Sequence, residues 1–353
     1  MAEMTSRERV LRTFRFEETD RAAFDVMESA IWPEFGQWCA EKLGLTEGEA
    51  ILDRFGVDFR WVWVMAQAPQ GVDFTDQKYA MPWTASYSDH ILERPLKNVR
   101  TVSEMLRKHE WMDPAWWDFG PAQRVREKHP DKAVAMLVHG TMLFMTACDF
   151  FGIEEALMRL LLEDEVLMAF FERQHEFAVE LLERACRETE GVVDICWVMD
   201  DIATQRALMM RPDLWRRHLK DLLRRHIEVI HEHNLLALFH SCGAIRDILP
   251  DLIEIGVDAV LPFQTTADGM DAASIARDFG GKIAFYGGMD IQQLLTFGSE
   301  DDVRREVRKN VDLFATCGGY IVANSHHCIE NIKPENVVAM LDEARQYHPA
   351  RRK

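Results

Sequence analysis

Two short clusters of metal-binding side chains stand out in this sequence. His240 and Cys242 lie two residues apart, directly after the apolar run 235–239. A second cluster, residues 326–328 (His-His-Cys), follows the apolar run 320–323. Thiolate sulfur and imidazole nitrogen are ligands that Zn²⁺ prefers, and catalytic zinc sites keep one coordination position open. The two clusters together predict an enzyme with a zinc site.

We expect the third zinc ligand to come from the second cluster. Residues i and i+2 of an extended strand point the same way, so His240 and Cys242 can reach one ion. We favour Cys328 as the third ligand because a second thiolate matches Cys242 in softness. His326 is the next candidate and His327 the third. The alternative is that Cys242 is a small buried side chain and His240 a hydrogen-bonded histidine at a strand end.

Other polar side chains also end or follow apolar runs. Asp200 and Asp201 follow the run 194–199, and adjacent carboxylates can bind a metal, take a proton or hold a substrate. We expect these two residues to be catalytic; the alternative is that they cap the helix that follows. The residues expected to bind substrate are His139, Gln205, Gln264, Tyr286 and Trp197. The glycine pair 287–288, directly after Tyr286, permits a tight turn and the close approach of a ligand.

Such distant residues need a scaffold that brings strand ends together. Short apolar runs predict strands at 21–26, 59–65, 133–138, 192–199, 235–239, 258–262, 282–286 and 320–323. Amphipathic segments predict a helix capped by Thr5 or Ser6 and further helices at 34–54, 122–128, 141–150, 153–161, 164–189, 212–233, 244–255, 271–279, 290–296, 300–316 and 335–347. Seven or eight such βαβ units favour an α/β fold, the closed (β/α)8 TIM barrel, with its active site at the carboxyl ends of the strands.

The whole chain, residues 1–353, is predicted to be one barrel domain with an N-terminal extension. A long irregular excursion is expected at about 66–120, where tryptophans and prolines are frequent. A loop of that length is usually functional, so we expect it to cover one face of the barrel. The tryptophans of this region would give an aromatic-lined pocket, which would suit an apolar or ring-bearing substrate.

Charge and composition exclude several classes of function. The net charge of −18 repels phosphate backbones and anionic lipids, so we expect no nucleic acid or membrane partner. The sequence has no run of about eighteen apolar residues and its charged start lacks a signal core, so we expect a cytoplasmic protein. The seven scattered cysteines are then reduced thiols. The oligomeric states that we consider include a homodimer.

Several segments resemble the uroporphyrinogen decarboxylase superfamily. They are 200–205 (DDIATQ), 240–245 (HSCGAI), 249–258 (LPDLIEIGVD), 286–290 (YGGMD) and 334–337 (PENV). The likeness covers about 130 to 347 and extends to the opening segment 6–11. It implies a (β/α)8 barrel and one of two activities. One branch is a decarboxylase without a metal, and the other contains zinc-dependent methyltransferases that work with corrinoid proteins or with thiols such as coenzyme M.

The methyltransferase branch is the one that this sequence resembles. The decarboxylase branch carries the signature Met-Arg-Gln-Ala-Gly-Arg after its first strand, whereas segment 25–32 reads DVMESAIW and has no basic residue. A substrate with many carboxylates needs arginine partners. The methyltransferases carry His-x-Cys, matched by His240 and Cys242, and a distant cysteine whose place falls nearest His326, two residues before Cys328.

The resemblance therefore implies a zinc-dependent methyltransferase. Its small-molecule methyl donor would be a small methylated compound, with an O-methyl or aromatic methyl ether as the expected class, and its methyl acceptor a corrinoid (cobalamin) carried by a partner protein. Zinc acts as a Lewis acid in such a site. The alternative is a metal-free, decarboxylase-like lyase that acts on a small organic acid through Asp200 and Asp201.

Overall fold

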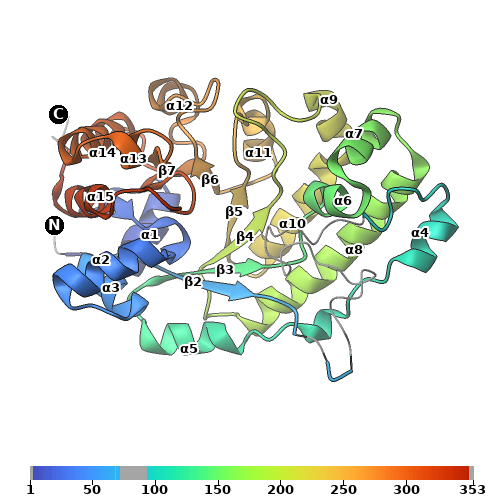
Figure 1. Cartoon of the computed structure of the whole chain (residues 1–353), viewed down its shortest axis with the longest axis horizontal. Helices are drawn as coiled ribbons and strands as arrows, with labels where there is room; N and C mark the ends of the chain where they lie inside the picture. Colours follow the sequence, from blue (N-terminus) through green and yellow to red (C-terminus); the bar gives the residue numbers. More distant parts are fainter. Residues whose placement is uncertain (1–2, 68, 72–93, 350–353) are drawn as a thin grey trace.

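The computed structural model describes residues 3–67, 69–71 and 94–349, and its centre is one sheet of eight parallel strands (Figure 1). The strands are β1 (Ala23–Phe24), β2 (Phe59–Val64), β3 (Ala133–Val138), β4 (Ile195–Met199), β5 (Leu236–His240), β6 (Ala259–Phe263), β7 (Ala284–Met289) and β8 (Tyr320–Asn324). Their order in the sheet is β1-β8-β7-β6-β5-β4-β3-β2. Helices pack around the curled sheet, as the predicted (β/α)8 barrel requires.

The helices largely follow the predicted segments. They are α1 (Ser6–Phe14), α2 (Pro33–Leu43), α3 (Gly48–Phe55), α4 (Val102–Lys108), α5 (Gly120–Lys128), α6 (Phe144–Phe151), α7 (Ile153–Leu161), α8 (Glu165–Glu188), α9 (Pro212–His218), α10 (Lys220–Glu232), α11 (Leu249–Glu254), α12 (Ala272–Phe279), α13 (Leu294–Phe297), α14 (Glu300–Phe314) and α15 (Pro334–Gln346). Short 3₁₀ helices are η1 (Met27–Ser29), η3 (Pro114–Trp116) and η4 (Arg246–Ile248). The predicted helix 34–54 is two helices, because Gly44 ends α2 in a left-handed conformation with φ 69°.

Two local features refine the prediction. The described part of the excursion at 66–120 contains the helices α4 and η3. The tight turn that the glycine pair permits does not form there, because Gly287 and Gly288 lie inside β7. A Cβ atom on Gly287 would stand 2.8 Å from the backbone nitrogen of Phe263, and one on Gly288 would stand 2.6 Å from the hydroxyl of Tyr320. The two glycines therefore let β7 approach its neighbours closely.

Alternation along the strands separates two cores. One set of side chains packs outward against the helices, and the other fills the barrel. The inner set combines the large rings of Phe59, Trp61, Trp197 and Tyr286 with alanines contributed by β1, β3, β6, β7 and β8. Small alanines opposite large rings fill a barrel at interior density without voids. This inner packing places a layer of aromatic rings below the carboxyl ends of the strands.

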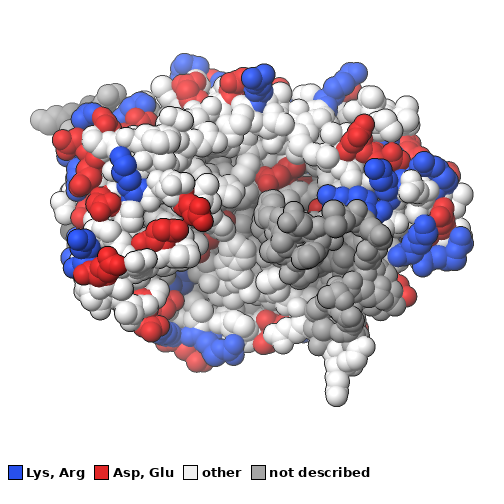
Figure 2. All heavy atoms as spheres, viewed as in Figure 1, with Lys and Arg blue, Asp and Glu red and all other residues white. Residues whose placement is uncertain are grey.

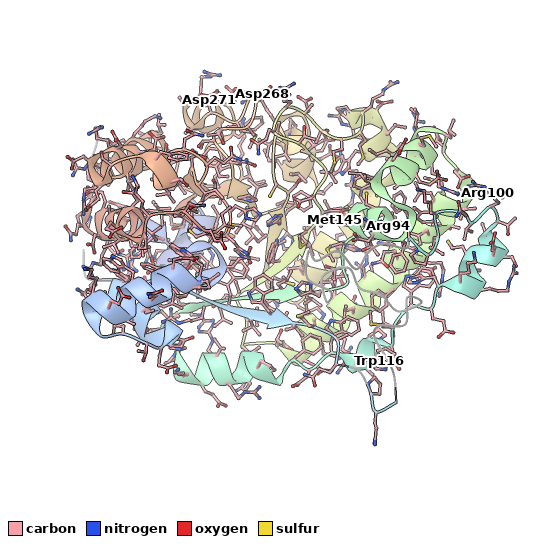
Figure 3. All side chains as sticks on the ribbon, viewed as in Figure 1. Arg94, Arg100, Trp116, Met145, Asp268 and Asp271 are labelled. Carbon is pink, nitrogen blue, oxygen red and sulfur yellow. The ribbon has the colours of Figure 1, made fainter. Side chains whose placement is uncertain are left out.

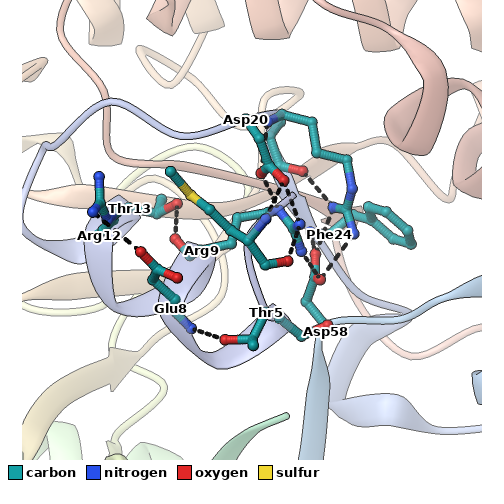
Figure 4. A network of polar contacts seen from close by, with 12 residues as sticks. Thr5, Glu8, Arg9, Arg12, Thr13, Asp20, Phe24 and Asp58 are labelled. Carbon is teal, nitrogen blue, oxygen red and sulfur yellow. Dashed lines mark hydrogen bonds and ion pairs between the residues drawn. The ribbon is translucent and has the colours of Figure 1, made fainter. Parts of the chain in front are cut away.

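The barrel closes between β1 and β2 around one buried carboxylate, Asp58 (Figure 4). Its amide donates to the carbonyl of Phe24, and its Oδ2 accepts from the Phe24 amide at 3.0 Å. Arg9 and Arg21 each donate to this carboxylate at 2.7 Å. Arg9 is itself buried and also pairs with Asp20. This network joins α1 to the two strands at the seam, and composition gave no hint of it.

The surface agrees with a charged, globular protein. Acidic and basic side chains are spread around the edge of the face seen in Figure 2, and the face is hollowed near its centre, where Figure 1 shows β2 to β5. In the described residues, no helix combines the length and the apolar character needed to cross a membrane.

Candidate metal centre and active site

The polar side chains singled out in the sequence lie at one end of the barrel. His240 is the last residue of β5, and Asp200 and Asp201 directly follow β4. His139 follows β3, and residues 326–328 follow β8. All these strands are parallel, so their carboxyl ends meet at the same rim. We call this rim the barrel mouth.

Three donor atoms come together at the barrel mouth. His240 Nε2 lies 3.7 Å from Cys242 Sγ and 3.7 Å from Asp201 Oδ1. The ligand atoms of these three residues all lie within 4.8 Å of one another. In the described part of the chain, neither residue 326 nor residue 328 joins this group. The cluster brings an imidazole nitrogen, a sulfur and a carboxylate oxygen from two neighbouring strands to one point.

Backbone contacts hold the His240–Cys242 loop in place. The Cys242 amide donates to Asp201 Oδ1 at 2.7 Å, and the Gly243 amide donates to Gln264 Oε1 at 2.8 Å. Gly243 has φ 89°, and a Cβ there would stand 2.4 Å from the carbonyl oxygen of Thr204. Gly243 therefore lets the loops after β4 and β5 pack against each other. Gln264, expected to bind substrate, uses its amide oxygen to position the loop.

Burial controls the protonation of the cluster. It lowers the pKa of His240 to about 4, although the nearby Asp201 carboxylate opposes the shift, so the imidazole is neutral at pH 7. Burial also raises the pKa of the Cys242 thiol, and Asp201 raises it further. A divalent cation reverses this balance because it favours the thiolate. The neutral imidazole is ready to donate its lone pair to a cation.

The three residues of the second cluster differ in their exposure: His326 is exposed, His327 is half-buried and Cys328 is buried. His326 is an exposed residue of the loop after β8, and partial desolvation lowers the pKa of its imidazole. Cys328 is 9% exposed and belongs to the apolar core between the barrel and its helices. Burial alone raises the pKa of its thiol. Of the candidates for third ligand, His326 is thus exposed, and Cys328 packs in the outer core.

His327 pairs with a carboxylate that sequence reasoning missed. Its Nε2 lies 2.6 Å from Glu28 Oε2, and the Glu28 side chain is almost fully buried. Burial lowers the pKa of His327, but the hydrogen bond and charge of Glu28 outweigh it and raise the pKa. Glu28 and Ser29 have φ values of 56° and 52°, a left-handed conformation that carries strain in residues with side chains. The only sequence signal was the acidic stretch after the first strand.

The two adjacent aspartates have different surroundings. Asp200 Oδ2 accepts from the Phe144 amide at 2.8 Å and Oδ1 from the Met145 amide at 2.7 Å. Asp200 therefore caps α6, which precedes it in the chain. Met145, one of the two residues whose amides donate to Asp200, is labelled in Figure 3. Burial raises the pKa of Asp200 to about 7, against these two donors. Asp201 instead faces His240 and Cys242.

Aromatic rings line the barrel below the cluster. The Trp197 ring lies 4.9 Å from the His240 ring, centroid to centroid. Trp61 and Trp63 meet Trp197 edge to face, at 5.5 Å and 6.1 Å. The His139 ring lies 5.7 Å from Trp63, and burial lowers the pKa of His139 to about 4. These rings form an apolar wall on one side of the donor atoms.

Below these rings, Asp25 collects several donors. Its Oδ2 accepts from the Tyr286 hydroxyl and, at 2.9 Å, from the Trp61 indole; its Oδ1 accepts from the Ser29 hydroxyl at 3.0 Å. Asp25 thus ties the aromatic layer to the strained segment that carries Glu28. Gln205, in contrast, is an exposed residue of the loop after β4, where its carbonyl accepts from the Asp268 amide.

Asp25 predicts a pH dependence of folding. Burial raises its pKa to about 7, opposed by its hydrogen-bond donors, whereas an unfolded aspartate has a pKa of about 3.9. The folded state then keeps a proton that the unfolded state releases, so stability that is full below about pH 4 is lost as the pH rises toward 7. Asparagine does not titrate, so in Asp25→Asn the free energy of unfolding should fall less over this pH range, by up to about 4 kcal/mol. Urea unfolding between pH 4 and 8 measures it, and equal pH slopes in the two proteins would contradict it.

A second group of possible metal donors lies elsewhere. Glu49, Asp53 and His129 place ligand atoms within 4.8 Å of one another. The buried guanidinium of Arg60 donates to Glu49 at 2.8 Å and also to Asp53. A fixed positive charge already balances these carboxylates, so we interpret the group as an ion-pair network.

Comparisons with known proteins agree with this architecture. No curated protein sequence matches the chain. A methyltransferase from Methanosarcina mazei shares 16% identity over 98% of this chain and 99% of its own, with a TM-score of 0.65. Xylanase 10B from Thermotoga maritima (11% identity, 97% and 98% covered, TM-score 0.49) and an L-ribulose 3-epimerase (12% identity, 93% and 92% covered, TM-score 0.47) are more distant. At such identities, the first of these likenesses shows a shared fold.

The family model is more specific than the structural likeness. The model of uroporphyrinogen decarboxylase (URO-D) matches residues 120–347, which is more than half of the chain. The matched region contains β3 to β8, and with them the donor atoms of His240, Cys242 and Asp201. The chain therefore belongs to the uroporphyrinogen decarboxylase family.

Proposed function

We propose that this protein is a zinc-dependent methyltransferase that moves a methyl group between a small methylated compound and a corrinoid protein. The observation that carries the proposal is the meeting of His240 Nε2, Cys242 Sγ and an Asp201 oxygen at the barrel mouth. Membership of the uroporphyrinogen decarboxylase family and the fold shared with a Methanosarcina mazei methyltransferase support it. The acidic segment 25–32 after the first strand also argues against a polycarboxylate substrate.

The donor atoms fit a zinc ion. Zn–N bonds of about 2.0 Å and Zn–S bonds of about 2.3 Å, at the tetrahedral angle, separate the nitrogen and sulfur by about 3.5 Å. Nε2 of His240 and Sγ of Cys242 are 3.7 Å apart. The neutral imidazole has a free lone pair, and the donor types are those that zinc selects.

When bound, zinc would supply Lewis acidity, which polarises the atom that carries the methyl group. The rings of Trp197, Trp61 and Trp63 would hold the substrate and keep water from the donor atoms. The sequence assigned both Asp200 and Asp201 to orienting the substrate or supplying a proton; we keep Asp200 in that role, because Asp201 lies among the donor atoms of the cluster. His139, Gln205 and Gln264 remain proposed substrate-binding residues, with Gln264 acting through the Gly243 amide, whereas the fully buried Tyr286 would act only through Asp25.

Methyl transfer to free cobalamin tests the proposal. The protein is purified without added metal, its zinc content is measured, and it is incubated with reduced cobalamin and a panel of methyl ethers and methylamines. We expect about one zinc per chain and the methylcobalamin absorbance to rise with at least one donor. Protein that contains no zinc and transfers no methyl group across the panel would contradict the proposal. Release of CO₂ from a small organic acid by metal-free protein would favour the lyase.

A further inference from the structure

We infer that the metal ion of the proposed methyltransferase is held by a single thiolate, Cys242, together with His240 and the carboxylate of Asp201. The ligand set is then nitrogen, sulfur and oxygen, and Cys328 takes no part. This inference rests on the metal of the proposed function and deepens it. It replaces our expectation from the sequence, which placed a second sulfur on the ion.

The position of Asp201 carries the inference. Its Oδ1 lies 3.7 Å from His240 Nε2, the same separation that joins Nε2 to the sulfur of Cys242. Zn–O and Zn–N bonds of about 2.1 Å and 2.0 Å predict a tetrahedral edge of about 3.4 Å, so a small movement seats an ion among the three atoms. The Cys242 amide fixes Asp201 by donating to the same oxygen at 2.7 Å. An ionised carboxylate has about four acceptor sites, so one amide leaves room for a cation.

The surroundings of Cys328 point the other way. Its side chain is 9% exposed and packs in the apolar core outside the barrel. Within the described residues, Cys328 is outside the group of donors that lie within 4.8 Å of one another. The Cys328 thiol therefore packs in the outer core and not with the donor atoms of the cluster.

A carboxylate in place of a second thiolate changes what the site does best. Carboxylate oxygen is a harder ligand than thiolate sulfur and passes less electron density to the ion. More positive charge then remains to polarise an oxygen of the substrate. A site with one thiolate thus suits a methyl donor that presents oxygen, such as a methyl ether, better than the activation of a thiol nucleophile.

Cobalt substitution tests the ligand set without any turnover. Co²⁺ replaces zinc in the full chain, and the near-ultraviolet sulfur-to-cobalt band is compared among the wild type, Cys242→Ser, Cys328→Ser and Asp201→Asn. Cys317→Ser, which removes another half-buried thiol, is the matched control. We expect Cys328→Ser and Cys317→Ser to keep the full band, and Cys242→Ser to lose it. Asp201→Asn should keep the band, shift the visible d–d bands and weaken Co²⁺ affinity about 10- to 100-fold.

Three outcomes would separate the ideas. A band that falls to half in Cys328→Ser would show two thiolates and overturn the inference while leaving the methyltransferase proposal intact. An unchanged Co²⁺ affinity and visible spectrum in Asp201→Asn would also overturn it. If His326→Gln instead shifted the d–d bands and weakened Co²⁺ binding, the third ligand would be His326. Wild-type protein that binds neither Co²⁺ nor Zn²⁺ would instead remove the metal and the proposed function together. Circular dichroism of each metal-free variant checks that it is folded.

Discussion

Cys242→Ser is expected to reduce methyl transfer by about three orders of magnitude and to release the metal ion. A serine hydroxyl has nearly the shape of the thiol, but it does not ionise at neutral pH and binds zinc poorly. Losing the Lewis acid removes several kcal/mol of stabilisation from the reaction, and each factor of ten in rate corresponds to about 1.4 kcal/mol. The Cys242 side chain is half-buried and serine has nearly its volume, so the fold should survive.

Zinc content and the rate of methylcobalamin formation measure this effect together. Cys317→Ser controls for the loss of a thiol, because Cys317 lies before β8, away from the carboxyl ends of the strands. A Cys242→Ser protein that keeps both its zinc and its rate would remove the cysteine from the chemistry. Loss of rate with full zinc would place the thiol beside the substrate instead of on the ion.

Asp58→Ala is expected to destabilise the fold by about 3–5 kcal/mol, the usual cost of removing one partner from a buried ion pair. The carboxylate is fully buried and faces two guanidinium groups, those of Arg9 and Arg21 (Figure 4). Alanine would leave both charges without this counter-ion and the Phe24 amide without its acceptor. The loss falls on the seam where β1 meets β2, so it should lower the stability of the whole barrel.

Urea unfolding measures the free-energy difference, and an exposed ion pair supplies the control. Glu8 and Arg12 pair at 3.1 Å on the surface of α1, and both side chains are well exposed. Exposed pairs contribute about 0–1 kcal/mol, so Glu8→Ala should unfold almost as the wild type does. Equal midpoints for Asp58→Ala and Glu8→Ala would mean that the seam depends on its backbone contacts and on apolar packing alone.

Much of the fold could be predicted because its signals are local. The apolar run 133–138 is β3 and the amphipathic segment 153–161 is α7, both with the predicted bounds. Thr5 caps α1, accepting from the Glu8 amide, as its residue type predicts. Helices that end inside a long amphipathic segment were less visible. The segment 212–233 is two helices, α9 and α10, divided at Leu219, and nothing in its composition marks the break.

The candidate site was predictable in part for the same reason. His240 and Cys242 were found together because alternation along one strand predicts which side chains share a face. The choice among residues 326–328 was open, because three polar residues in a loop have no period that assigns their directions. Cys328 was favoured on chemistry, and its side chain packs into the outer core. Glu28 was missed because its partner, His327, is 299 residues away.

The sequence by itself determined the eight βα units, their order along the chain and the rim that carries the polar groups. The signals were hydrophobic periodicity, helix caps and the polar residues at strand ends. These features depend on contacts between residues that are only a few positions apart, so each segment of sequence specifies its own. Tertiary structure alone decided which partner each carboxylate meets. It placed Asp201 beside His240, Asp200 on α6, Glu28 on His327 and Asp58 between two arginines. The physical reason is that charge pairing acts through space, and only the closure of the barrel brings these distant segments within range.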